Sequence, residues 1–284
     1  MTDPAVARVH DGEVPEAAGL DAFLRDGFLA YDHDPRLAAW VTALRPHARR
    51  LAQDPALVAQ WLRCGGSWFA GVGAVGNTPD GAVPAAGVPP LACDALDFAR
   101  EALGFGAGPL DLAQLSIPYV GYPAAPAEGE SEAAFRFRRD RDAAHVDGLE
   151  RDAARRRRLG EAHAFILGIP LEETPLGAAP MVVWQGSHHL IRAALRARLA
   201  DIAPADWPGE DITEAYQAAR RAVFERCPRV VLQAQPGEAY LVHRLAVHGV
   251  APWPQAVPAT PLGRPVVYFR PEPARDFQRW LADP

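Results

Sequence analysis

The sequence predicts a mainly β fold with flanking helices, and two patterns along the chain support this prediction. From about residue 110 onward, short apolar runs with many β-branched residues are separated by Pro, Gly and acidic residues, which is typical of antiparallel strands in a sandwich or barrel. Before that point, apolar residues recur at helical spacing. A hydrophobic content of 49% in 284 residues allows a sizeable core and excludes global disorder.

We expect a single domain over residues 1–284. Its first part, 1–108, is predicted to be mostly helical and to support a β core over 109–272, which a helical insert interrupts at about 188–226. This length suits one large β domain or two ordinary ones. We find no internal repeat that would divide it.

The first part is predicted to contain three helices and one short strand. The helices are expected at 21–32, 34–53 and 89–105, and the strand within 67–75. Apolar residues in these helices recur every three to four positions. Proline marks the start of the second helix at Pro35 and of the third at Pro89, as expected for a first helical turn.

The second part is predicted to contain six strand segments and two helices. The strand segments are 110–122, 163–173, 180–188, 228–235, 238–250 and 263–272. The helices are 188–202 and 213–227, and Ser187 is a candidate cap for the first of them.

Composition excludes several classes of protein. The 29 basic residues, all arginine, against 35 acidic ones give a net charge of −6, which disfavours a nucleic-acid binder. The lack of lysine excludes Schiff-base chemistry and the lysine of a phosphate-binding loop. No apolar run is long enough to span a bilayer, and the acidic N-terminus is unlike a secretory signal, so we expect a cytoplasmic protein with no membrane partner. The three cysteines, Cys64, Cys93 and Cys227, are too widely spaced for a disulfide framework.

The histidines indicate a metal site. His145 and Asp147 are two residues apart, which on an extended strand places both side chains on one face. A third ligand from a distant strand would complete a facial triad that leaves open positions on Fe(II). His248 and His243 are the candidates, and because they are five residues apart on a predicted strand, only one of them should face the site.

These motifs together resemble a known family. HVDG, VWQGSHH, PGEAYLVHRLAVHGVAP and GRPVVYFR occur in the order seen in the phytanoyl-CoA dioxygenase-like family of Fe(II)/2-oxoglutarate-dependent oxygenases. The N-terminal FLRDGFLAYD also resembles the opening of that family, in which a helix ends at D-G-F before a strand. The resemblance extends from about residue 20 to 272. It implies a double-stranded β-helix (jelly-roll or cupin-like) core, and Fe(II), 2-oxoglutarate and O2 as cofactor and cosubstrates.

Carried over residue by residue, the resemblance implies that His145, Asp147 and His248 are the catalytic metal ligands. Arg264 would bind the distal carboxylate of 2-oxoglutarate, a role that suits a planar guanidinium, and Arg270 on the same strand face is the alternative. The implied reaction hydroxylates a small organic substrate, with anionic substrates among the candidates, and releases succinate and CO2.

The sequence departs from the family pattern at three places. Val250 replaces a frequent hydroxyl residue that helps to hold the cosubstrate, Val146 replaces a frequent Gln between the ligands, and the 16-residue step from His248 to Arg264 is long. The alternative function is therefore a cupin-like barrel that binds a metal or metabolite without catalysis, or without 2-oxoglutarate.

Several further residues have two possible roles, either in packing or in binding. His188 and His189 fit a loop and helix start, and Trp184 fits packing. His163 could be a core histidine or could face the barrel interior. Candidates for a hydrogen bond to the cosubstrate are Gln114, Ser116 and Tyr119. The arginine cluster comprises Arg136, Arg138, Arg139, Arg141, Arg151 and Arg155 to Arg158, and it could form an electrostatic collar for an anion or a solvated helix with interspersed acids.

Overall fold

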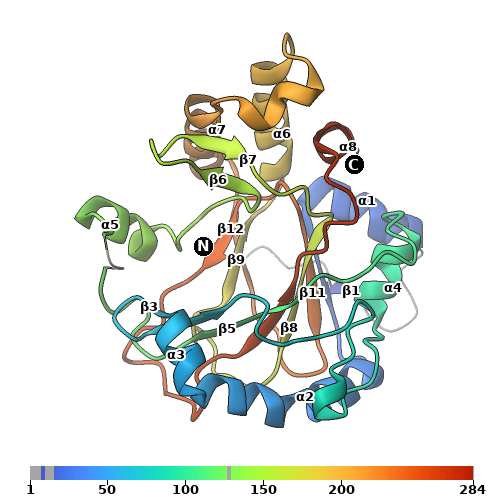
Figure 1. Cartoon of the computed structure of the whole chain (residues 1–284), viewed down its shortest axis with the longest axis vertical. Coiled ribbons are helices and arrows are strands. Elements are labelled where there is room, and N and C mark those ends of the chain that lie inside the picture. The colour runs from blue at the N-terminus through green and yellow to red at the C-terminus, as the bar shows by residue number, and fades with distance from the viewer. Residues whose placement is uncertain (1–7, 10–15, 127–128, 284) are drawn as a thin grey trace.

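Two sheets of mostly antiparallel strands form the centre of the protein (Figure 1). The computed structural model describes residues 8–9, 16–126 and 129–283. The larger sheet has the strand order β1-β2-β11-β8-β13-β5-β4-β3, and the smaller has the order β10-β9-β12. The predicted fold class is therefore confirmed at the level of a mostly antiparallel β protein with helices.

The strands of the larger sheet come from both halves of the chain. They are β1 (Arg8–Val9), β2 (Phe28–Tyr31), β3 (Leu62–Arg63), β4 (Trp68–Gly71), β5 (Gln114–Pro118), β8 (Phe165–Pro170), β11 (Ala239–His243) and β13 (Val266–Phe269). The smaller sheet contains β9 (Met181–Trp184), β10 (Arg229–Leu232) and β12 (His248–Val250), and β6 (Leu149–Arg151) pairs with β7 (Arg157–Leu159) as a separate hairpin.

Side chains alternate between the two faces of each strand. In β13, Val266 and Tyr268 belong to an apolar cluster that also contains Met181 and Val183 of the smaller sheet. Val267 and Phe269 of β13 instead belong to the core that packs under the N-terminal helices. The even-numbered residues of this strand therefore face the smaller sheet, and the odd-numbered ones face the helices.

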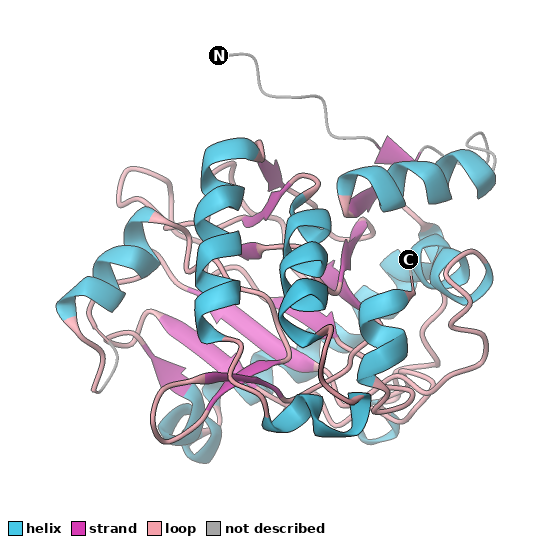
Figure 2. Cartoon of the chain, turned by 90° about the horizontal axis from the view of Figure 1, so that it is seen from above, coloured by secondary structure: helices cyan, strands magenta, loops and turns pink. Residues whose placement is uncertain are grey.

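Helices lie in front of and behind the strands in the view from above (Figure 2), and the N-terminal ones cover the outer face of the larger sheet. The N-terminal helices are α1 (Glu16–Asp26), α2 (Pro35–Gln53), α3 (Pro55–Trp61) and α4 (Asp94–Glu101), with the short helix η1 (Pro84–Ala86) between the last two. The predicted helix 34–53 is confirmed as α2, whose N-cap Asp34 accepts a hydrogen bond from the backbone N–H of Arg36 at 2.7 Å. The third predicted helix is shorter than expected because it begins only after the proline pair Pro89–Pro90, whose rings remove N–H donors and favour extended backbone.

The predicted helix 21–32 ends early. Gly27 has φ +83, a conformation that favours glycine, and a Cβ there would also lie 2.6 Å from the His188 ring. Phe28 to Tyr31 then form β2, which pairs with β11. The order of helix, glycine and strand agrees with the family resemblance, in which a helix ends at D-G-F before a strand. It differs from the helix to residue 32 that the apolar spacing predicted.

A second helical layer covers the smaller sheet. It contains α6 (Ser187–Leu199), η2 (Pro204–Gly209) and α7 (Thr213–Arg226), and its core cluster includes Val182 and Trp184 of β9. The two predicted helices of this region are confirmed. Ser187 was wrongly expected to cap α6, because Gly186 holds the cap position and the Ser187 hydroxyl accepts a hydrogen bond from the Val247 N–H at 2.8 Å.

Several elements were not predicted from the sequence, among them α3, α5 (Glu132–Asp140), the β6–β7 hairpin and α8 (Phe277–Ala282). The predicted strand 238–250 is in fact two strands in different sheets, since the chain turns after His243 and the Ala246 N–H donates to the His243 carbonyl at 2.8 Å. No helix among the described residues is long and apolar enough to cross a membrane.

Candidate metal centre

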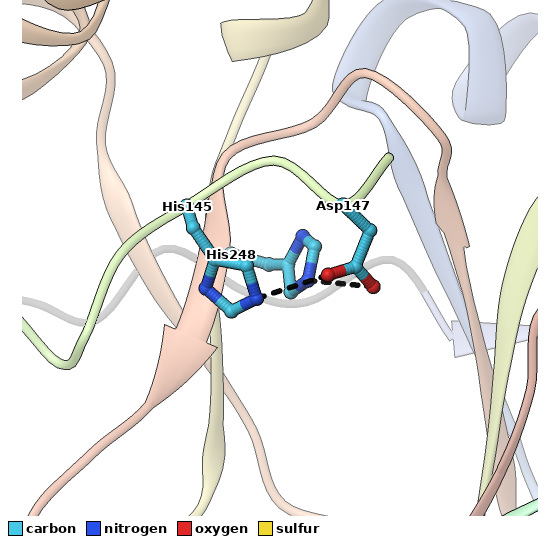
Figure 3. A group of neighbouring side chains, drawn as sticks. All are labelled: His145, Asp147 and His248. Atoms are coloured by element: carbon cyan, nitrogen blue, oxygen red, sulfur yellow. Dashed lines mark ion pairs between the residues drawn. The ribbon is translucent and has the colours of Figure 1, made fainter. Parts of the chain in front are cut away.

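Two histidines and one aspartate come together at one edge of the space between the sheets. The nearest nitrogens and oxygens of His145, Asp147 and His248 all lie within 4.8 Å of one another. Nε2 of His145 is 3.0 Å from Oδ1 of Asp147, and Nε2 of His248 is 3.6 Å from Oδ2 of Asp147. Figure 3 shows the two rings and the carboxylate pointing toward a common centre. The three residues predicted to bind the metal therefore lie where one ion could contact all of them.

The loop that carries His145 is held against the strand that carries His248. The backbone N–H of each histidine donates to the carbonyl of the other, at 2.8 and 2.9 Å. Gly249, the next residue of β12, permits this approach, because a Cβ at that position would overlap the Asp142 carbonyl. The expected extended strand at His145 is thus reduced to one isolated bridge.

Val146, which lies between His145 and Asp147, points away from the candidate metal position. The Val146 side chain is buried in the cluster beneath α6 and α7, and its N–H donates to the Tyr216 hydroxyl at 3.1 Å. His145 and Asp147 consequently share one side of the loop, as their spacing predicted, although the segment is not a regular strand.

Backbone carbonyls orient both imidazole rings. Nδ1 of His145 lies 2.9 Å from the Ala143 carbonyl, and Nδ1 of His248 lies 2.9 Å from the Ala246 carbonyl. A carbonyl only accepts hydrogen bonds, so each Nδ1 carries a proton, and Nε2 is the ring nitrogen that faces the candidate metal position. This is the usual arrangement for histidines that bind a metal through Nε2.

The Asp147 carboxylate remains ionised. Its burial raises the pKa, but hydrogen bonding and charge interaction with His145 and His248 outweigh burial and hold the pKa well below the usual value. One carboxylate and two imidazole nitrogens that converge in this way suit a divalent first-row metal. The residues present therefore fit a two-histidine, one-carboxylate site.

His243 lies outside this group. Its Nδ1 accepts a hydrogen bond from the Leu245 N–H at 2.9 Å, its Nε2 is 3.0 Å from Nη2 of Arg192, and its ring packs near Phe23 and His188. Of the two candidates for the third ligand, the structure brings only His248 to the other two.

Arg264 is a buried cation on the inner side of β13. Its exposed fraction is 1%, and Nη1 donates to the Ala179 carbonyl at 3.0 Å. Nε and Nη2 have no hydrogen-bond partner among the described residues. Burial lowers the pKa of Arg264, but the neighbouring Tyr240 and Tyr268 hydroxyls outweigh it and raise the pKa, so the group keeps its charge.

Arg270 lies beside the metal ligands rather than beside Arg264. Its Nη1 is 3.3 Å from Oδ2 of Asp147 and 4.0 Å from a carboxylate oxygen of Glu161. Arg264 precedes β13 and Arg270 follows it, and both are an even number of residues from Val266 and Tyr268. Both side chains are therefore expected on the face toward the smaller sheet, at opposite ends of the strand.

Two features near the site carried little signal in the sequence. His163 is 1% exposed with no partner for either ring nitrogen among the described residues, and burial lowers its pKa to about 4. The Tyr240 and Tyr268 hydroxyls lie 3.0 Å apart on the inner face. The even spacing of Arg264, Tyr268 and Arg270 could have indicated Tyr268, whereas Tyr240 becomes a neighbour only through sheet pairing.

The other candidates divide between the two faces. Gln114 and Ser116 alternate with core residues of the outer face and pair with Tyr268 and Val266, so they lie on the inner side, where Ser116 accepts a hydrogen bond from Trp68 at 2.9 Å. Tyr119 instead packs against the core between the larger sheet and the N-terminal helices. Trp184 packs under α7 against Phe224.

The remaining histidines and the arginine cluster have local contacts. His188 is buried, with Nε2 2.8 Å from the Leu24 carbonyl, and His189 stacks on it at the start of α6. Arg138 pairs with Glu130, Arg139 pairs with Asp140, and Arg156 and Arg158 both pair with Asp152. Cys64 and Cys93 are buried and free, and Cys227 is half-buried.

The fold and the site thus define a mostly antiparallel two-sheet protein with a candidate His–Asp–His metal centre. No family model and no curated protein matches the chain.

Three solved structures are among those that the chain resembles. AviO1 from Streptomyces viridochromogenes Tue57 has 18% identity and a TM-score of 0.49, covering 93% of this chain and 98% of that one. EctD from S. alaskensis in its apoform has 20% identity and a TM-score of 0.46, covering 94% and 80%. SnoK, a non-heme alpha ketoglutarate dependent carbocyclase from nogalamycin biosynthesis, has 14% identity and a TM-score of 0.44, covering 91% and 85%.

Proposed function

We propose that this protein is an Fe(II)- and 2-oxoglutarate-dependent oxygenase of the phytanoyl-CoA dioxygenase-like type, which hydroxylates a small organic substrate. His145, Asp147 and His248 would hold the iron. The iron would supply the activation of O2, and the overall reaction would convert 2-oxoglutarate, O2 and substrate into succinate, CO2 and hydroxylated product. A large, mostly antiparallel sheet and a small antiparallel sheet that enclose one apolar space support the double-stranded β-helix assignment.

The observation that carries this proposal is the buried guanidinium of Arg264. A buried cation is costly unless it is paired. Among the described residues, no carboxylate forms an ion pair with Arg264, whose neighbours are the Ala179 carbonyl and the Tyr240 and Tyr268 hydroxyls. Two N–H groups of a planar guanidinium are the natural partners of a carboxylate. The distal carboxylate of 2-oxoglutarate would supply both the charge and the acceptors.

The position of Arg264 suits a dicarboxylate that reaches the metal. Its partner Ala179 lies four residues from Val183 along the chain, and Val183 is paired with His248. At about 3.3 Å per residue, Ala179 and Val183 are at most roughly 13 Å apart. The arginine side chain and a short keto acid together can span such a distance.

Two tyrosines support the same placement. Val250 offers no hydroxyl to the cosubstrate, but the Tyr240 and Tyr268 hydroxyls lie on the inner face next to Arg264. Either hydroxyl would donate a hydrogen bond to the carboxylate that Arg264 binds. The apolar residues around them would exclude water from the bound keto acid.

The test is an anaerobic titration of Fe(II) and 2-oxoglutarate into metal-free protein, with the visible charge-transfer band of a chelated keto acid as the readout. We expect a band in the wild type, no band in His248→Ala, and a band in Arg264→Leu only at much higher 2-oxoglutarate. Arg49 is an exposed arginine on α2 that pairs with Glu172 at 2.6 Å, and the control variant Arg49→Leu should behave as wild type. Iron binding without a band in the wild type would favour the cupin-like alternative, and no iron binding would favour a non-catalytic barrel.

A further inference from the structure

The two oxygens of the Asp147 carboxylate have different neighbours. Oδ1 faces Nε2 of His145 at 3.0 Å. Oδ2 lies 3.6 Å from Nε2 of His248 and 3.3 Å from Nη1 of Arg270. A guanidinium against one oxygen restricts rotation of the carboxylate about its Cβ–Cγ bond. The orientation of the other oxygen toward the metal position is then defined.

The backbone on either side of Arg270 is itself anchored. Phe269 ends β13, and the carbonyl of Pro271 accepts a hydrogen bond from the Ala164 N–H at 2.7 Å. The Glu272 carboxylate accepts one from the Ala162 N–H at 2.7 Å. Arg270, with one quarter of its side chain exposed, therefore lies between the end of β13 and a segment that is tied to residues 162–164.

Simple charge pairing does not account for this placement. The other acidic neighbour, Glu161, is half-exposed and more distant, at 4.0 Å. A cation next to a metal ligand also repels a divalent metal, so on charge alone Arg270 would weaken metal binding. A favourable role must therefore come from its position against Oδ2, where the guanidinium fixes the orientation of the carboxylate.

We propose that Arg270 is a positioning residue for the metal centre. It holds Asp147 through Oδ2, so that the carboxylate meets the metal with one oxygen alongside Nε2 of His145 and His248. Partners of metal ligands commonly change metal affinity 10–100-fold when they are removed. This inference rests on the metal-binding part of the proposed function, and it assigns Arg270 a task different from that of Arg264.

The test compares Arg270→Met, Arg270→Lys and Arg270→Gln with wild type, using Fe(II) alone without oxygen and then Co(II). Calorimetry gives the affinity, and the visible Co(II) spectrum reports the ligand geometry. We expect Arg270→Met to lower the affinity about 10–100-fold and to alter the Co(II) spectrum. Lysine and glutamine each keep an N–H group that can contact Oδ2, so each should restore part of the affinity. Arg49→Met is the control for loss of an arginine–carboxylate contact.

The outcomes separate this inference from the proposed function. If wild type binds no Fe(II) or Co(II), the metal-centre proposal fails. If wild type binds both and Arg270→Met binds equally or more tightly with the same spectrum, the positioning role alone is overturned. Unchanged metal affinity with weaker 2-oxoglutarate binding would also overturn it, because Arg270 would then bind the cosubstrate. Should Arg270→Met lose its folded circular-dichroism spectrum, the lysine and glutamine variants decide the question.

Discussion

At the residue scale, burial and charge conflict at Arg264. The side chain is 1% exposed, yet two of its nitrogens have no partner among the described residues. Unsatisfied buried polar groups cost about 1–3 kcal/mol each, and charged groups cost more. Such a residue is a poor contributor to the stability of the ligand-free protein, and under the proposed function 2-oxoglutarate would supply the missing partner.

Arg264→Met should separate stability from binding. We expect the free energy of unfolding without ligand to stay the same or to rise by up to about 3 kcal/mol, because an uncompensated charge is replaced by an apolar chain of similar length. Wild type with metal should be stabilised further by 2-oxoglutarate, by about 2.7 kcal/mol at 100 times its Kd, and the variant should not. Thermal and denaturant unfolding measure both effects. A loss of more than about 3 kcal/mol without ligand would show that Arg264 is structural.

Three buried histidines, His163, His188 and His243, should make the fold sensitive to acid, because burial lowers the pKa of each. Burial lowers the pKa of His188 to about 4 from an ordinary value of 6.5, and it lowers the pKa of His163 to about 4 as well. Between pH 6.5 and 4 the unfolded chain binds more protons than the folded one, so stability falls as the pH falls through this range. The His188 contribution is roughly 3 kcal/mol at most.

Melting temperatures measured from about pH 7 down to about pH 4.5 test this prediction. His188→Gln can still donate to the Leu24 carbonyl but does not titrate, so its melting temperature should fall less steeply than that of wild type. His33→Gln, at an exposed position, should keep the wild-type profile. Identical profiles for wild type and His188→Gln would contradict the assignment.

At the scale of single elements, the short strand β12 joins the ligands into one site. It pairs with β9 on one side and with the His145 loop on the other. Gly249 in its middle lies directly under the Asp142 carbonyl, and a Cβ added to this glycine would lie 3.2 Å from the Ala144 N atom. The glycine after His248 is thus required for steric reasons, which gives a physical meaning to the H-G pair seen in the sequence.

Gly249→Ala should displace the His145 loop from β12. We expect a loss of about 1–3 kcal/mol in stability, as for other overpacked positions, together with weaker Fe(II) binding measured by calorimetry. Gly209→Ala is the matched control, because a Cβ there meets nothing within 4 Å. Wild-type metal affinity in Gly249→Ala would mean that the loop can adjust without moving His145.

At the scale of the whole molecule, the site lies between sheets whose outer faces are each covered by helices. The α6–α7 layer packs on the outer face of the smaller sheet through a cluster that includes Leu195, Val182 and Val223. The N-terminal helices pack on the larger sheet. Stability of the whole fold therefore depends on residues that do not touch the ligands.

Leu195→Ala should lower stability without removing the metal site. A fully buried leucine in a packed cluster costs about 2–5 kcal/mol when it is truncated. Leu112→Ala, at a position that is 63% exposed, should change stability by less than about 0.5 kcal/mol. Denaturant unfolding measures both, and Fe(II) affinity well below the melting temperature should match wild type. Loss of metal binding in folded Leu195→Ala would indicate that the helical layer shapes the site directly.

The sequence by itself determined the elements with strong local signals. The α2, α6 and α7 helices and most strands of the second half follow from periodicity and turn residues, because these are properties of neighbouring residues. The pairing of His145 with Asp147 followed from the same kind of local spacing. By contrast, α5 and α8 were not predicted, since α5 is highly charged and buries none of its residues, and α8 is only six residues long.

Only the tertiary structure decided how distant segments meet. The segment 238–250 has one continuous apolar pattern, but it divides between two sheets, and this division separates His243 from His248. Arg264 and Arg270 are equivalent by parity, yet one is buried beside Tyr240 and the other contacts Asp147. Strand pairing and burial are long-range properties that local spacing does not encode. The sequence therefore predicted candidate metal ligands, and the folded chain decided which histidine joins His145 and Asp147.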